Sequence, residues 1–250
     1  MIHKEIYTIW LREIKKALVD KWQIIISIGW PLFLIFALGI GIDSFIDVSD
    51  LGVSYTELLG PGIIAILAMA GSMSIGNSLI EDNKGFIKEL LVAPISRSSI
   101  FIGKVLGEMT INLGTTLIAI IIFLFFVQLL NITSILLSLL FMILIAFGFY
   151  GFGIVLSSLF KKTKSYQMIT GLLVAVMIFL SGAFFPTEKL PFTLKIFVLI
   201  NPLTYGVDSL RNILVGFGEF GLIRDLLVLI TFAIVMLVLG SYLFKRSLEK

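Results

Sequence analysis

The sequence contains no cysteine and only one histidine, His3, and both absences exclude classes of chemistry. Without cysteine there are no disulfides and no thiolate metal sites, and a single histidine cannot form a multi-histidine metal cluster. Charged residues are also scarce, because they make up 14% of the 250 residues, whereas soluble domains average about 25%. Hydrophobic residues reach 58% and the mean hydropathy is +1.10. This balance indicates an integral membrane protein.

Apolar segments long enough to cross a bilayer occur along the whole chain. A transmembrane helix takes about 20 mostly apolar residues. The stretch from Met109 to Phe160 is uncharged and too long for one crossing, and it divides at the polar cluster 128–134. We therefore expect an all-α integral membrane protein that forms one domain over residues 1–250. Six transmembrane helices are predicted, at residues 22–42, 58–80, 105–127, 135–160, 166–187 and 225–244.

The basic residues predict the orientation of these helices. Fifteen of the 19 lysines and arginines fall on one side, in both termini, the loop 81–104 and the turn 161–164. Basic residues concentrate on the cytoplasmic side of membrane proteins. We therefore expect a multi-pass protein of the cell (plasma) membrane with both termini and the 81–104 loop in the cytoplasm.

Residues 1–21 have a helical period but carry many charges. Ile6, Ile9, Trp10 and Ile14 fall on one side, with lysines and glutamates on the other. This pattern favours an amphipathic helix that lies in the cytoplasmic membrane interface. The alternative is an ordinary helical lead-in to the first crossing.

The segment 188–224 separates the last two predicted crossings. Its uncharged run, 196–207, is too short to cross a bilayer as a helix and is interrupted at Asn201-Pro202. We expect a re-entrant helical hairpin at the outer face, in which Asn201 and Thr204 bind backbone groups freed at the break. The alternative is a surface loop with an apolar run that arose by chance.

A compact charged segment, EDNKGFIKELLVAPISRSSIFIGK at residues 81–104, lies between the second and third crossings. On a helical wheel, Phe86, Ile87, Leu90 and Leu91 fall in one continuous arc, and charged residues occupy most of the rest. Such a helix binds either lipid or the groove of a partner. Its acidic and basic residues are nearly balanced, which favours a protein partner over anionic lipid.

Three stretches resemble the type-2 ABC exporter permease family and keep its order: EDNKGFIKELLVAPISR followed by GK at 103–104, FLSGAFFPTEKLP at 179–191, and NPLTYGVDSLR at 201–211. The similarity is strongest to daunorubicin-resistance-type permeases and covers essentially the whole chain. It implies a half-transporter, in which two permeases, as a homodimer or a heterodimer, lie above two separate ABC ATPase subunits that hold ATP and Mg. It also implies the export of amphipathic or hydrophobic, drug- or lipid-like cargo, as in multidrug efflux.

The resemblance also implies roles for individual segments. The family's first coupling helix falls on residues 82–92, whose apolar side would enter a cleft on the ATPase. Residues 1–21 match the connecting helix, and 188–224 match the re-entrant helices. The residues implied in ATPase coupling are Phe86, Ile87, Lys88, Glu89, Leu90, Leu91, Pro94 and Arg97.

The chain shows no nucleotide-binding motif. The nearest match to a phosphate loop runs from Gly71 to Ser78, but Asn77 stands where a lysine must reach the phosphates. We therefore expect a transport subunit that is not an enzyme and holds no cofactor, and the pattern indicates no nucleic-acid partner. Small residues here and in the fourth crossing are more typical of close helix packing; they are Ala68, Ser72, Gly76, Gly148 and Gly151.

Aromatic residues near the outer end of the fifth crossing indicate a path for apolar cargo. By resemblance, the second and fifth crossings face the axis of a permease dimer. Phe179, Phe184 and Phe185 are candidates for an outer gate, and Asn201 and Thr204 are candidates for the same path. The alternative for each phenylalanine is packing or contact with lipid.

The competing class is a secondary (ion-coupled) or passive transporter without an ATPase partner. Such proteins usually place ionisable residues near the membrane midplane, and the predicted crossings have almost none. Glu108, near the start of the third crossing, either pairs with Lys104 four residues earlier or faces the cytoplasmic mouth. Asp208 and Arg211 are spaced to pair on the outer side.

Overall fold

The computed structural model describes residues 2–43, 54–82, 97–128, 131–184, 187 and 191–247. Within these ranges the chain is helical and contains no β-strand, which confirms the expected all-α class. The helices are α1 (Ile2–Val19), α2 (Lys21–Asp43), α3 (Tyr55–Met73), α4 (Ile75–Asp82), α6 (Arg97–Phe126), α7 (Ile132–Ser157), α8 (Thr163–Phe179), α9 (Phe192–Ile200), α10 (Pro202–Val215) and α11 (Leu222–Ser247).

Four helical stretches of the described chain are long and apolar enough to cross a membrane. A fifth is obtained if α1 and α2, which meet at a bend of 67°, count as one broken span. Helix α8 is apolar but has 17 residues, fewer than the roughly 20 that a crossing takes. Six crossings therefore stay a prediction. The four stretches are Tyr55–Glu81, Ile102–Phe126, Ile132–Ser157 and Leu222–Leu243.

The fifth predicted crossing ends earlier than expected. We predicted it to reach residue 187, but α8 ends at Phe179 and the chain turns through Ser181 and Gly182. Gly182 has a φ of +72°, a left-handed conformation that glycine adopts without steric cost. The chain thus leaves the helical path after Phe179 in a turn that contains a suitable glycine.

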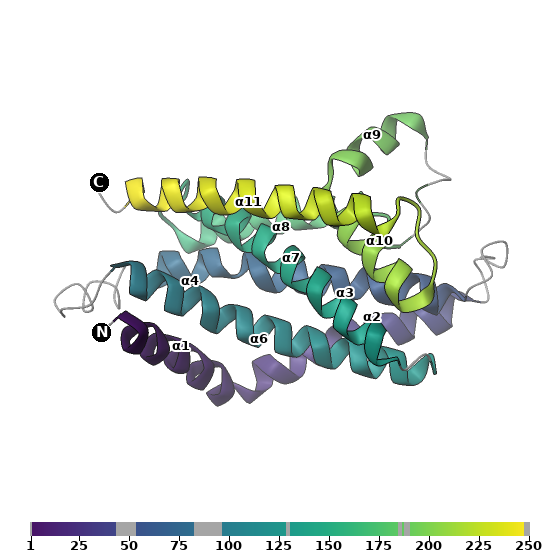
Figure 1. The fold of residues 1–250 in the computed structure, drawn as a ribbon, viewed down its shortest axis with the longest axis horizontal. Helices are drawn as coiled ribbons and strands as arrows, with labels where there is room; N and C mark the ends of the chain where they lie inside the picture. Colours follow the sequence, from purple (N-terminus) through teal and green to yellow (C-terminus); the bar gives the residue numbers. More distant parts are fainter. Residues whose placement is uncertain are drawn as a thin grey trace.

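The long helices run side by side along the longest axis of the molecule (Figure 1). The start of α1, the end of α11, the end of α4 and the start of α6 all lie at one end, and α9 and α10 lie at the other (Figure 1). We call these the N-terminal end and the α10 end. This arrangement agrees with a chain whose termini share one side, while its orientation in a membrane stays a prediction.

Helix α3 lies in the core, and a glycine of α7 sets how closely α7 and α11 approach each other. Leu58, Leu59 and Ile64 of α3 have no exposed surface. At Gly151 of α7, an added Cβ atom would lie 2.5 Å from the backbone carbon of Met236 in α11. The missing side chain therefore lets the backbones of α7 and α11 approach closely, in the manner of small residues at membrane helix interfaces.

Helices α9 and α10 meet at the predicted break. Asn201 caps α10 by accepting a hydrogen bond from the backbone N–H of Leu203 at 3.1 Å, and its Nδ2 donates to the carbonyl of Met177 at 2.7 Å. Thr204 Oγ1 donates to the carbonyl of Val198 at 2.8 Å. Backbone groups around the break thus find side-chain partners inside the protein, and the depth of this hairpin in a membrane stays a prediction.

Candidate functional site

The predicted coupling helix falls in residues 83–96, which lie outside the described part of the chain. Its role in ATPase coupling therefore stays a prediction. Arg97 begins α6, and its side chain is also outside the description. The other predicted coupling positions without description are Phe86, Ile87, Lys88, Glu89, Leu90, Leu91 and Pro94.

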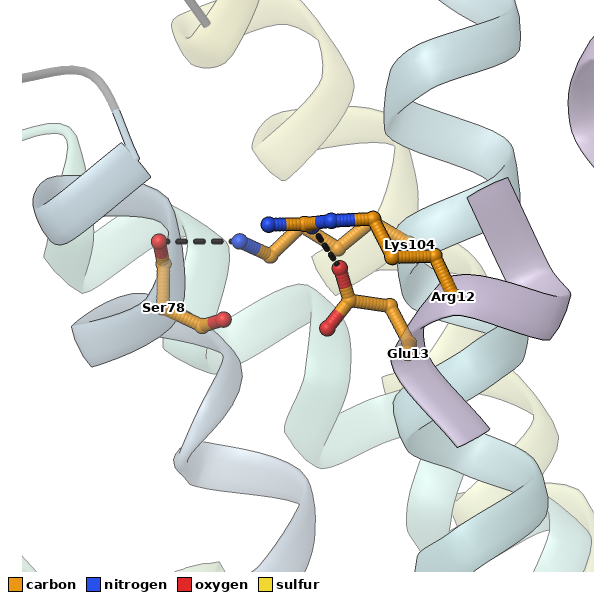
Figure 2. Close-up of polar contacts among 4 residues, drawn as sticks. All are labelled: Arg12, Glu13, Ser78 and Lys104. Carbon is orange, nitrogen blue, oxygen red and sulfur yellow. Dashed lines mark hydrogen bonds and ion pairs between the residues drawn. The ribbon is translucent and has the colours of Figure 1, made fainter. Parts of the chain in front are cut away.

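The two helices that flank this loop are joined to each other at its base. Lys104 of α6 is 2% exposed, and its Nζ donates to the carbonyl oxygen of Ser78 in α4 at 2.9 Å (Figure 2). Ser78 lies midway along α4, and a charged donor strengthens this hydrogen bond to its carbonyl. The segment that leads into the loop and the segment that leaves it are thus held together by one buried lysine.

Helix α1 packs along the first half of α6 and adds a third element to this base. An added Cβ at Gly103 would lie 2.8 Å from the carbonyl oxygen of Ile6, and one at Gly107 would lie 2.6 Å from Cβ of Glu13. Trp10 Nε1 donates to Thr110 Oγ1 at 3.0 Å. Two glycines of α6 therefore provide the surface on which α1 lies.

Glu13 of α1 is 4% exposed, although its place in an amphipathic helix predicted a solvent-facing side chain. Its carboxylate pairs with the guanidinium of the neighbouring Arg12 at 2.6 Å. Figure 2 shows this pair beside Lys104 and Ser78, in the space between α1 and α4. A pair with one exposed partner stabilises little by itself, so burial by α6 holds Glu13 in place.

An open cavity of about 440 Å³ adjoins this base and is lined by residues of α1, α2, α3, α4, α6 and α8. It reaches from the exposed residues Lys16 and Glu81 to Asn112 and Thr115 deeper in α6. Because α6 rises about 1.5 Å per residue, Asn112 lies about 15 Å along the helix from the start of its apolar span at Ile102. The remaining lining residues are Glu13, Ala17, Ile24, Ser27, Leu67, Gly71, Ser74, Asn77, Ser78, Glu108, Ile111 and Gln167.

Polar side chains fill the space left by the small residues of α3 and α4. Asn112 Nδ2 donates to the carbonyl of Ala68 at 3.0 Å and to Ser72 Oγ at 2.9 Å. Its amide occupies the place where a side chain at Gly71 would lie, and the ring of Tyr166 does the same at Gly76. The predicted stripe at Ala68, Ser72 and Gly76 thus receives polar side chains. Gly148 and Gly151 of α7 instead face α11.

Glu108 lines the cavity near its mouth. Its Oε2 atom is buried and accepts no hydrogen bond from any described residue, and the same holds for Oδ1 of Asn77. Ser78 and Lys104 lie beside its carboxylate, and Glu13 and Lys16 are within electrostatic range. Glu108 lies beside Lys104 and also lines the mouth of the cavity, so its position fits both alternatives left by the sequence, and the cytoplasmic side of this mouth stays a prediction.

The aromatic residues near the end of α8 lie at the α10 end. The rings of Phe179 and Phe184 have centroids 6.1 Å apart; Phe179 is 62% exposed and Phe184 is half-buried. Phe185 lies outside the described residues. An outer gate therefore stays a prediction, and the hydrogen bonds of Asn201 and Thr204 to backbone carbonyls show how these two residues support the structure.

Asp208 and Arg211 do not pair as expected, because each binds a different backbone segment. Arg211 is 2% exposed; its Nε and Nη2 donate to the carbonyl of Leu58 at 3.2 and 3.1 Å, and Nη2 also donates to Gly182 at 3.0 Å. Asp208 accepts hydrogen bonds from the backbone N–H groups of Glu219 and of the following residue, at 2.6 and 3.0 Å. Arg211 thus ties α10 to α3 and to the turn after α8.

These long apolar helices, with a polar cavity at one end, define a multi-pass membrane protein. The family model described as ABC-2 type transporter matches residues 4–215, and the chain belongs to this family. The resemblance seen in the sequence motifs is thereby confirmed. Proteins of this family are membrane transport permeases, so the chain is a transport subunit by family.

Several curated proteins are similar to this chain. It is 28% identical over 218 residues to the putative transport permease ycf38 of Cyanophora paradoxa, covering 81% of this chain and 74% of that protein. It is 28% identical over 163 residues to the probable multidrug ABC transporter permease YbhR of Escherichia coli K12, covering 64% of this chain and 44% of YbhR. It is 27% identical over 209 residues to nodulation protein J of Azorhizobium caulinodans, covering 82% and 78%. The match thus spans less than half of YbhR and about three quarters of the other two relatives.

Proposed function

We propose that this chain is the membrane-spanning permease of an ATP-driven ABC exporter, and that ATP and Mg bind to separate ATPase subunits. The observation that carries this proposal is membership of the ABC-2 type transporter family. The sequence supports it as well, because Asn77 replaces the lysine that a phosphate loop requires. Two permease copies and two ATPases, arranged across the plasma membrane with both permease termini in the cytoplasm, complete the proposed assembly.

The proposed coupling uses the 81–104 loop as the ATPase docking element. Its apolar residues, among them Leu90 and Leu91, bind a cleft on the ATPase, as an amphipathic helix binds a groove. Movement of the ATPase then displaces α4 and α6 together, because Lys104 joins them at the base of the loop. Helix α1 moves with α6, on which it packs.

The proposed cargo is amphipathic or hydrophobic and leaves from the cytoplasm or the inner leaflet. A relative is named a probable multidrug permease, which supports a drug- or lipid-like cargo. The cavity at the N-terminal end combines polar residues with apolar ones such as Leu67 and Ile111, and it is a suitable first binding place for such a molecule.

Substitution Leu90→Asp tests the docking role. We expect the affinity-tagged variant, purified from native membranes, to lose an ATP-binding partner that copurifies with the unaltered chain, because a charge on the apolar face opposes burial. The partner is detected by photolabelling with 8-azido-ATP. Lys84→Asp, on the polar side of the same predicted helix, should retain the partner. Retention by Leu90→Asp would refute the docking role.

A secondary transporter is the second candidate, and Glu108 is the observation that favours it. A carboxylate within a membrane-spanning segment is a common place for ion coupling, and Glu108 lines a cavity in such a segment. The two candidates separate in vesicles that contain only this chain. Uphill transport that is driven by an ion gradient in these vesicles would replace the ABC proposal with a secondary transporter. No uphill transport by the chain alone, together with transport once the ATPase and ATP are added, would support the ABC proposal.

A further inference from the structure

We propose that the cavity at the N-terminal end binds the ammonium head of an amphipathic amine, with Glu108 as its counter-charge and Asn77 as a hydrogen-bond acceptor. The inference rests on the proposed export function and names the chemical class of cargo that this site accepts. Charge, hydrogen-bonding capacity and shape each support it.

Charge comes first. Three carboxylates line the cavity, from Glu13, Glu81 and Glu108, and one lysine, Lys16. Two cations lie behind this lining: Arg12 pairs with Glu13, and Lys104, whose Nζ donates to a backbone carbonyl, lies beside Glu108. Lys16 has an exposed side chain at the mouth of the cavity. The lining itself thus carries more carboxylates than lysines, and this excess favours a cationic head group over an anionic one.

Hydrogen-bonding capacity is also one-sided. The hydroxyl groups of Ser27, Ser74 and Thr115 donate to carbonyls of their own helices, at 2.9, 2.6 and 2.9 Å. Among the described residues, two lining atoms are buried without a hydrogen-bond partner, Glu108 Oε2 and Asn77 Oδ1, and both are acceptors. A buried polar atom without a hydrogen bond costs free energy. A ligand that brings N–H donors would satisfy these acceptors, whereas an anion or an ether would not.

The shape and the lining fit an apolar chain behind the head group. Glu108 lies about 9 Å along α6 from Ile102, near the membrane surface on the N-terminal side. Deeper in the cavity, Ile24, Leu67 and Ile111 contribute aliphatic side chains. An amine with a hydrocarbon tail can thus place its charge at Glu108 and its tail among these residues. Both a cationic drug and a lipid with a primary ammonium head group have this chemistry.

The test is binding of tritiated dodecylamine to the full chain in nanodiscs of phosphatidylcholine, a lipid without N–H donors. Empty nanodiscs give the background from partition into lipid. We expect saturable binding, strong competition by unlabelled dodecylamine, weaker competition by dodecyltrimethylammonium and little by dodecanol. This order follows because dodecyltrimethylammonium keeps the charge but lacks N–H donors, whereas dodecanol has one O–H donor and no charge. Equal competition by dodecanol would overturn the inference without the need for any variant.

Two substitutions at the cavity should change the Kd of dodecylamine in opposite directions. Glu108→Gln keeps the shape and removes the charge, so the Kd of dodecylamine should rise about tenfold or more. Lys16→Gln removes a competing cation and should lower the Kd. Glu5→Gln, in α1 but outside the cavity lining, should leave it unchanged. An unchanged Kd for Glu108→Gln, in protein that elutes normally in size exclusion, would overturn the inference. If Glu108→Gln aggregates, Asn77→Ala serves as the second variant and should also weaken dodecylamine binding. Unchanged binding by Asn77→Ala would then count against the site.

Two further measurements identify the source of the amine and separate this inference from the proposed function. Phosphatidylethanolamine in the nanodisc should compete if a lipid head group is the natural occupant, and should not if the occupant is a free amphiphile; in both cases the site takes an ammonium group. Leu90→Asp should release the ATPase and retain dodecylamine binding. Retention of the ATPase by Leu90→Asp with intact dodecylamine binding would refute the docking proposal alone. Absence of saturable binding to the unaltered chain, with release of the ATPase by Leu90→Asp, would refute this inference alone.

Discussion

At the scale of single residues, Arg211 is the clearest structural anchor. Its guanidinium makes three hydrogen bonds to two backbone carbonyls at the start of α3 and after α8. Hydrogen bonds of a charged group are worth about 1.5–3 kcal/mol each. We expect Arg211→Met to lower the unfolding free energy by about 3 kcal/mol or more, and Arg211→Lys to restore only part of it because lysine lacks the planar fork.

The measurement is the melting temperature of the purified chain in detergent, monitored by size-exclusion chromatography with fluorescence detection. Arg224→Met is the matched control. Its guanidinium lies 4.9 Å from the ring centroid of Phe220, and an exposed cation–π contact is worth about 0.5–1 kcal/mol. An equal loss of melting temperature for both variants would contradict the anchor role of Arg211.

Local spacing in the sequence was a poor guide to these residues. Asp208 and Arg211 are three residues apart and predicted a pair, but the partners of Arg211 include Leu58, distant in sequence. Glu13 reads as part of a solvated face and is buried only because α1 packs on Gly107. In both cases the decisive contact is between distant segments, which periodicity does not report.

At the scale of elements, the close approach of α7 and α11 depends on Gly151. Substitution Gly151→Ala should lower the melting temperature, because the added Cβ would lie 2.5 Å from the backbone of Met236 and the helices must separate. Gly114→Ala in α6 is the control. No atom lies within 4 Å of the Cβ it would add, and alanine is favoured over glycine within helices by about 1 kcal/mol. A stabilising Gly151→Ala would contradict this packing.

The helices themselves were largely predictable, since uncharged runs of the required length mark them directly. Each of the six predicted segments overlaps a helix of the structure, including α2 and α8. The early end of α8 was missed, because the uncharged run continues through Ser181-Gly182, although this pair favours a turn. The capping of α10 by Asn201 followed the usual preference of asparagine for that position.

At the scale of the whole molecule, the predicted orientation can be tested with single cysteines, because the natural chain has none. We expect His3→Cys and Lys162→Cys to react with a membrane-impermeant maleimide only from the cytoplasmic side, and Lys195→Cys only from the outside. The measurement compares inverted and right-side-out vesicles. Labelling of all three from one side would refute the orientation, which rests on the distribution of basic residues.

The class and the family of this protein were predictable from the sequence, whereas the cavity was not. Composition and periodicity predicted the class of protein, and the motifs at 81–97 and 201–211 predicted the family. The cavity, in contrast, is lined by side chains of several helices that meet only after folding. The sequence offered the cytoplasmic mouth as one alternative for Glu108, but it did not predict that Asn77 would lie in the same cavity.

The buried bond between Lys104 and Ser78 has a mechanical consequence. This hydrogen bond resists separation of α4 from α6 at the base of the loop, whereas α4 otherwise packs on α7 and α8. Glu108 stands a single helical turn beyond Lys104, about 6 Å along the axis. If the loop docks an ATPase as proposed, a displacement of α6 at Lys104 also moves the carboxylate of Glu108 on the next turn.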